Sequence, residues 1–94
     1  MKFRKKPLVV EARHFRGDRE SGQAIQAWAA GTTPQCLIVM ETSPTFEIRT
    51  LIIPTPEGKM EASEGDWVIR GVRGEFYPCA ADIFAATYEP VEAP

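Results

Sequence analysis

Residues 60–78 read MEASEGDWVIRGVRGEFYP and carry the clearest structural signal in this chain of 94 residues. The run Trp67–Arg70 follows a Glu-Gly-Asp turn, and Gly74 closes a second turn just before the aromatic pair that begins at Phe76. Runs of β-branched and aromatic residues bounded by glycine and aspartate are typical of a β-hairpin. We therefore predict a hairpin in which Gly74 adopts a positive φ.

The first strand of this hairpin should show the alternation of a pleated strand. Trp67 and Ile69 fall on one face, and Val68, Arg70 and Val72 fall on the other. The hairpin therefore presents apolar and charged side chains from a rigid scaffold.

The chain before the hairpin begins with a strand and a helix. Residues 8–15 alternate imperfectly, which is typical of an edge strand. Residues 23–30 predict a short amphipathic helix, with Asp18 or Ser21 as its N-terminal cap and Gly31 as a left-handed residue at its end.

Three further strands are predicted at residues 36–40, 46–53 and 59–62, and a type I turn at residues 55–58 joins the last two. Residues 36–40 are apolar throughout, so we expect a central strand that is buried on both faces. After the hairpin, residues 80–86 predict one or two helical turns that carry Ile83 and Phe84 inward. Residues 87–89 then close the sheet.

The connections are mostly too short for crossovers, so the sheet should be mainly antiparallel. We predict an α+β fold with a strongly curled sheet, a half-barrel, one N-terminal helix and a short C-terminal helical turn. Residues 1–94 should form a single domain, with a basic lead-in at residues 1–6 and a flexible tail at residues 90–94.

Composition excludes several function classes. The formal net charge is −2, which gives no global attraction to nucleic acid or to an anionic membrane. No apolar run approaches the roughly 20 residues needed to cross a bilayer. The basic start lacks a following apolar segment, so we expect no signal peptide and a location in the cytoplasm.

Metal and cofactor chemistry has little support in the sequence. Cys36, Cys79 and His14 are the cysteines and the histidine of the chain, too few for a zinc site or a disulfide scaffold. The glycines form no phosphate-binding loop of standard spacing. We expect no cofactor, no metal and two reduced, buried thiols.

The candidate site residues, apart from Lys6, lie in the hairpin or in the turn just before it. Arg70, Arg73, Glu75 and Tyr77, joined by Lys6, form the predicted ligand- or partner-binding set, because arginine and aromatic residues are favoured at binding surfaces. Gly65, Asp66, Trp67 and Gly74 form a structural motif, in which Asp66 is expected to bond its own following backbone.

Several segments resemble a family of small phage and prophage proteins of unknown function. The resemblance is carried by MKFRKKPLVVEA at residues 1–12, by EGDWVIRGVRGEFYPC at residues 64–79, by Asp82-Ile83-Phe84 and by residues 87–91, TYEPV. The family pattern usually has proline before its Gly-Asp-aromatic turn, where this chain has Glu64. The resemblance implies a setting in the cytoplasm of a bacterial host and implies no activity and no catalytic residue.

Our leading expectation is a non-enzymatic phage-type accessory protein that binds a host protein or a small anionic, nucleotide-derived host ligand. A homodimer is also expected, since a small domain gains stability by oligomerising. One alternative is a nucleic-acid-binding protein that uses the basic N-terminus with Arg70 and Arg73, although the acidic balance disfavours it. A second alternative is a small hydrolase or nuclease that uses Asp66, Glu75 and His14.

Overall fold

The computed structural model describes residues 1–4 and 7–91. Two helices and six strands occur in this part of the chain, in the order β1 (Glu11–His14), α1 (Arg19–Ala30), β2 (Val39–Thr42), β3 (Arg49–Thr55), β4 (Gly58–Ala62), β5 (Trp67–Arg70), β6 (Phe76–Cys79) and α2 (Ala81–Thr87). The α+β class predicted from the sequence is confirmed.

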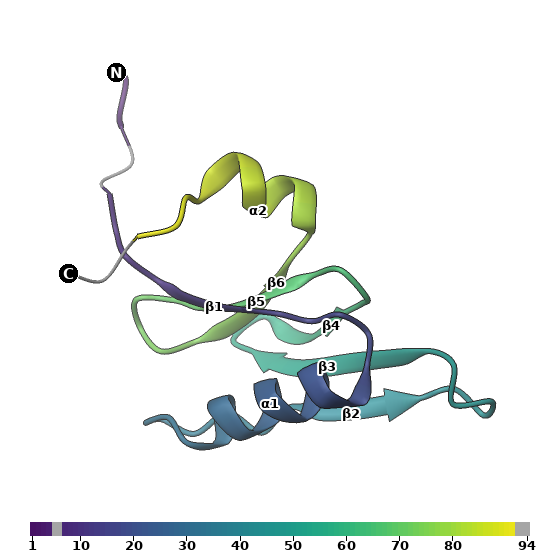
Figure 1. Ribbon diagram of the computed structural model, residues 1–94. Helices are drawn as coiled ribbons and strands as arrows, with labels where there is room; N and C mark the ends of the chain where they lie inside the picture. The colour runs from purple at the N-terminus through teal and green to yellow at the C-terminus, as the bar shows by residue number, and fades with distance from the viewer. Residues whose placement is uncertain (5–6, 92–94) are drawn as a thin grey trace.

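The strands form two antiparallel three-stranded sheets, with the orders β1-β5-β6 and β2-β3-β4. The predicted half-barrel is wrong, because neither sheet is strongly curled or closed in the described residues (Figure 1). The chain passes from the β2-β3-β4 sheet to the β1-β5-β6 sheet at the turn after β4. Gly65 donates its N–H to the carbonyl oxygen of Phe15 at 2.8 Å, and the Asp66 carbonyl accepts from the Phe15 N–H at 2.9 Å. These two bonds direct β5 to β1 rather than to β4.

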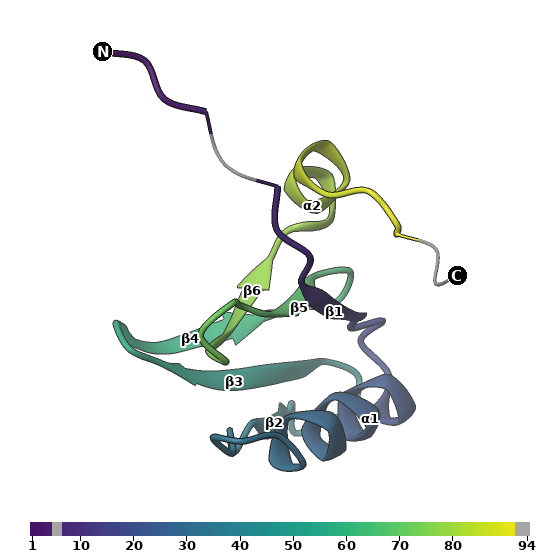
Figure 2. The same ribbon diagram turned by 90° about the vertical axis from the view of Figure 1, so that its left-hand side faces the viewer.

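The two helices lie on opposite sides of the molecule. α1 lies alongside β2, whereas α2 lies on the side of the β1-β5-β6 sheet that faces away from α1 (Figures 1 and 2). The core fills the space between the two sheets and α1, and its buried members are Phe15, Ile25, Ala29, Ile38, Leu51, Ile53, Ala62, Val68 and Phe76. α2 contributes no buried residue to it.

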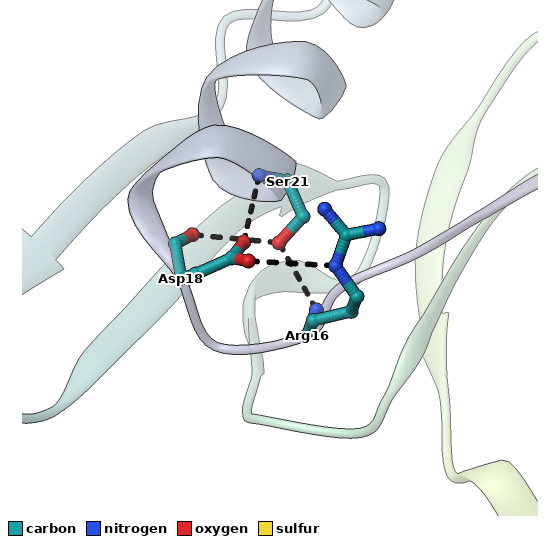
Figure 3. Close-up of polar contacts among 3 residues, drawn as sticks. All are labelled: Arg16, Asp18 and Ser21. Carbon is teal, nitrogen blue, oxygen red and sulfur yellow. Dashed lines mark hydrogen bonds and ion pairs between the residues drawn. The ribbon is translucent and has the colours of Figure 1, made fainter.

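α1 begins with the cap predicted from the sequence. The Asp18 Oδ1 atom accepts the Ser21 N–H at 2.8 Å, and the Arg16 Nε atom lies 3.4 Å from Asp18 Oδ2 (Figure 3). The left-handed end predicted at Gly31 is wrong, because its φ is −88°. The last turn is instead closed by the following loop, in which the Thr32 hydroxyl donates to the Ala29 carbonyl at 2.8 Å.

The apolar run at residues 36–40 does not form a central strand. β2 starts at Val39 and lies at a sheet edge. Ile38 is buried, but Leu37 and Val39 are 65% and 55% exposed. Continuous hydrophobicity in a sequence does not reveal whether a second layer covers the strand. No other strand pairs with the outer side of β2 in the described residues.

The strand predicted at residues 8–15 is shorter in the structure, although its edge position is confirmed. β1 begins at Glu11 because its partner β5 ends opposite it, at Arg70. At the other end of the chain, residues 87–89 form no strand. Ile83, predicted to point inward, is 57% exposed.

Candidate functional site

The β5–β6 hairpin exists as predicted, but its proposed binding residues are divided between two faces. Arg70 pairs with Phe76, and Ile69 pairs with Tyr77. Cross-strand partners point to the same face, and neighbours along a strand point to opposite faces. Arg70 therefore projects toward the core side with Phe76, whereas Tyr77 projects toward the α2 side.

The arginines of the predicted site do not gather around Tyr77. The Arg70 Nη2 atom donates to the Thr33 carbonyl at 3.4 Å, and its Nε atom is buried without a hydrogen-bond partner. Arg73 is exposed in the hairpin loop. Lys6 lies outside the described residues.

Tyr77 and Glu75 instead line a groove of about 530 Å³ between the two ends of the chain. We call it the terminal groove. Its lining residues come from residues 7–10, the β5–β6 hairpin, and the end of α2 with the segment that follows it: Pro7, Leu8, Val9, Val10, Gly71, Val72, Glu75, Tyr77, Thr87, Tyr88, Glu89 and Val91. Most of these side chains are apolar, which is the usual character of a binding cavity.

A stack of aromatic rings forms one wall beside this groove. The Phe84 ring lies parallel to the Trp67 ring, with centroids 4.2 Å apart and an angle of 8° between the planes. On either side of this pair, Tyr88 stacks on Phe84 at 5.1 Å and His14 stacks on Trp67 at 4.8 Å. A second cavity of about 300 Å³ reaches Trp67 and Phe84 and shares several lining residues with the terminal groove.

The charged residues that line the terminal groove, Glu75 and Glu89, are both acidic. The Oε2 atom of Glu75 is buried and accepts no hydrogen bond in the described residues, and Glu89 supplies a second carboxylate. Among the described residues, no arginine or lysine lines the groove. Burial, the nearby Tyr88 hydroxyl and the Glu75 charge together raise the pKa of Tyr77, so its hydroxyl stays protonated as a possible hydrogen-bond donor.

The three residues of the hydrolase hypothesis do not converge. His14 pairs with Trp67 at one end of β5, next to Asp66, whereas Glu75 lies beyond the other end of that strand. The His14 Nε2 atom lies 3.2 Å from the Gly65 carbonyl oxygen.

Asp66 has the structural role predicted for it, with one correction. Its Oδ2 atom accepts the N–H of Ser63 at 2.9 Å, so it bonds the backbone that precedes it rather than the backbone that follows. Gly65 and Gly74 both have positive φ, 93° and 85°, as turn glycines do.

Both cysteines are free thiols, but they are half-buried rather than buried. Burial raises the pKa of the Cys36 thiol, and burial together with the Asp66 and Asp82 carboxylates raises the pKa of Cys79. Within the described ranges, no group of three or more His, Cys, Asp or Glu side chains could hold a metal ion. None of the helices described is both long enough and apolar enough to cross a membrane.

Comparison with protein-family models, with curated proteins and with solved structures yields no match for this chain. The site therefore has to be argued from its own geometry. Sequence reasoning missed the walls made by residues 7–10 and 87–91. A signal was present, because Leu8-Val9-Val10 and Val91 place apolar residues in both of the segments that flank the folded part of the chain.

Proposed function

We propose that this chain is a non-enzymatic binding protein of phage type, which holds a segment of a host protein in the terminal groove in the bacterial cytoplasm. The phage setting rests on the resemblance of residues 1–12 and 64–79 to that family. The binding mode rests on one observation: the groove is mostly apolar, and Glu75, one of its lining residues, has a buried carboxylate oxygen without a hydrogen-bond partner in the described residues.

Exposed apolar side chains at the terminal groove favour a protein segment as the occupant. Leu8, Val9, Val72 and Val91 are 57%, 77%, 63% and 71% exposed. Contiguous apolar surface at a groove is characteristic of a protein or ligand contact, because its burial releases water from apolar area. A peptide with one or two apolar side chains would cover this surface.

The carboxylates of the groove favour a bound segment that contains a basic residue. A buried carboxylate oxygen without a donor is costly, and a lysine or arginine from a partner would satisfy it. The same carboxylates repel phosphate, so a nucleotide-derived ligand or nucleic acid has less support at this groove than a peptide. The favoured occupant is an extended segment with a basic residue next to an apolar one.

Selection of binding peptides from a random displayed library tests this proposal, followed by fluorescence anisotropy with the purified chain. We expect enriched peptides to combine an apolar residue with lysine or arginine. Val9→Asp should weaken their binding at least about tenfold, because it places a charge in the apolar wall. Glu75→Gln should weaken basic peptides more than variants in which their lysine is replaced by methionine.

Val39→Asp is the matched control, since Val39 is also exposed but lies on β2 and is not one of the residues that line the groove. It should leave peptide binding unchanged. Enrichment of acidic peptides, or binding that Val9→Asp and Glu75→Gln leave unaltered, would show that the groove is not the binding site. Tight binding of a nucleotide to the unmodified chain would favour the anionic-ligand alternative.

A further inference from the structure

β1 leaves one side of its backbone open. It has β5 as its only strand neighbour in the described residues. Phe15, directly after β1, turns both backbone groups toward β5, where they bond Asp66 and Gly65. Backbone groups alternate in direction along a strand, so Arg13 and Glu11 face β5 as well. Ala12 and His14 must then direct their N–H and C=O groups to the open edge.

The β5–β6 hairpin independently indicates the same direction for the backbone groups of β1. Gly71 donates its N–H to the Glu75 carbonyl at 2.7 Å, which makes this pair a hydrogen-bonded one toward β6. Two residues earlier, Ile69 also bonds toward β6, which leaves Val68 and Arg70 to bond β1. These two residues face Arg13 and Glu11 in the observed register.

An open edge of this kind is a template for another strand, and native proteins block it with proline, a bulge, a very short strand or charged side chains. β1 is four residues long, contains no proline and has a continuous register with β5, and its charged residues, Glu11 and Arg13, have opposite signs. These charges repel an indiscriminate partner but allow one that pairs Glu11 with Arg13. The charge pattern of the strand identifies which partner fits it.

A second copy of the chain is that partner. Antiparallel pairing through the open edge must place outward-facing residues opposite each other, so the two-fold axis passes a residue such as Ala12. With the axis at Ala12, Glu11 of each copy faces Arg13 of the other, which gives two opposite-charge pairs. A shift of the axis to Glu11 or Arg13 would place like charges directly opposite each other.

The geometry points to a homodimer in which two β1 strands pair antiparallel about Ala12 and join two three-stranded sheets into one of six strands. The charged side chains are already held on the face where they would meet. The Glu11 Oε2 atom accepts from the Trp28 indole N–H at 3.3 Å, and the Arg13 guanidinium lies 5.0 Å from the centre of the same indole. This order lowers the entropy lost on association. The interface uses the strand edge and is independent of what the terminal groove holds.

Sedimentation equilibrium across a concentration series tests the proposal, with the 10.5 kDa chain as the monomer mass. The unmodified chain should approach twice that mass. Glu11→Lys or Arg13→Glu alone should weaken self-association at least about tenfold, because each replaces two attractive pairs by two repulsive ones. An equimolar mixture of the two variants should dimerise again, because both cross-strand pairs then join opposite charges.

The mixture keeps the test independent of folding, since a variant that fails to fold cannot restore association. Ala12→Pro should also abolish the dimer, because it removes an outward N–H while the bonds to β5 remain. Val39→Asp, on the edge strand β2 of the other sheet, is the control and should leave the dimer intact. A monomer at every concentration would overturn the proposal. So would a dimer that Ala12→Pro leaves intact, or a variant mixture that stays monomeric.

Discussion

Phe84→Ala should detach α2 from the sheet without unfolding the rest of the molecule. Phe84 is the only residue of the helix that is not exposed, and its ring stacks on Trp67 and on Tyr88. Each aromatic pair contributes about 0.5–1.5 kcal/mol beyond area burial, so the loss of both costs about 1–3 kcal/mol. A helix of seven residues has little stability of its own. The lost free energy should therefore weaken the attachment of α2 to the sheet rather than the stability of the rest of the molecule.

Native-state hydrogen exchange measures this effect directly. The amides of Phe84 and Tyr88 donate to the carbonyls of Ala80 and Phe84 at 2.8 and 2.9 Å, so both are protected only while α2 is formed. We expect their protection to fall about 5- to 150-fold in the variant, which is the same 1–3 kcal/mol expressed as an equilibrium constant. Amides of β5 should keep their protection.

Ile83→Ala is the matched control, because Ile83 lies in the same helix and is 57% exposed. It should leave the exchange of both amides nearly unchanged. The reasoning would be refuted if Phe84→Ala lowered the global free energy of unfolding by the roughly 3–5 kcal/mol typical of a core phenylalanine. Unchanged protection at Phe84 and Tyr88 would refute it equally.

Three other predictions concern turns and titrating groups. Gly65→Ala should cost about 1–2 kcal/mol in denaturant unfolding because φ is +93°, and Gly17→Ala should cost more, because its Cβ would also lie 2.8 Å from the Glu64 Cβ. Stability should fall above about pH 10, where unfolded tyrosine ionises while the raised pKa of Tyr77 keeps the folded form neutral, and Tyr77→Phe should flatten this fall in pH-dependent melting. Hydrogen bonds from the following helix turn lower the pKa of Asp18, so any melting-temperature advantage over Asp18→Asn should disappear below about pH 4.

Local signals in the sequence were enough to predict much of the fold. The cap at Asp18 and the positive φ of Gly74 follow from side-chain chemistry within a few residues. The edge position of β1 was likewise readable, because apolar and charged residues alternate only imperfectly in residues 8–15. Such features depend little on the rest of the chain, so a single sequence contains the information.

The division into two sheets depended on a contact that no local pattern contains. Phe15 and the turn at Gly65 and Asp66 lie about fifty residues apart in the sequence, and their hydrogen bonds decide which strand β5 pairs with. At β5 the predicted alternation of faces holds, but it does not reveal burial, because Val68 and Ile69 are both fully buried although they point to opposite faces. Covering layers, rather than the strand itself, determine such burial.

The candidate site could be predicted only in part for a related reason. Glu75 and Tyr77 do line the terminal groove, whereas Arg70 faces the other way. Counting residues through the hairpin turn would have revealed this, since the pairing of Gly71 with Glu75 places Arg70 opposite Phe76. The walls from residues 7–10 and 87–91 required a tertiary contact between chain ends, which single-sequence patterns do not encode.

The two proposals have a joint physical consequence. Cross-strand pairs across a two-fold axis point to the same face of a sheet, so a dimer through β1 would place both α2 helices and both terminal grooves on one face of the six-stranded sheet. A partner with two copies of the recognised segment would then bind the second groove intramolecularly, and its apparent affinity would exceed that of a single peptide. This gain should vanish in Ala12→Pro, while the affinity for an isolated peptide persists, because the substitution removes the dimer and leaves each groove in place.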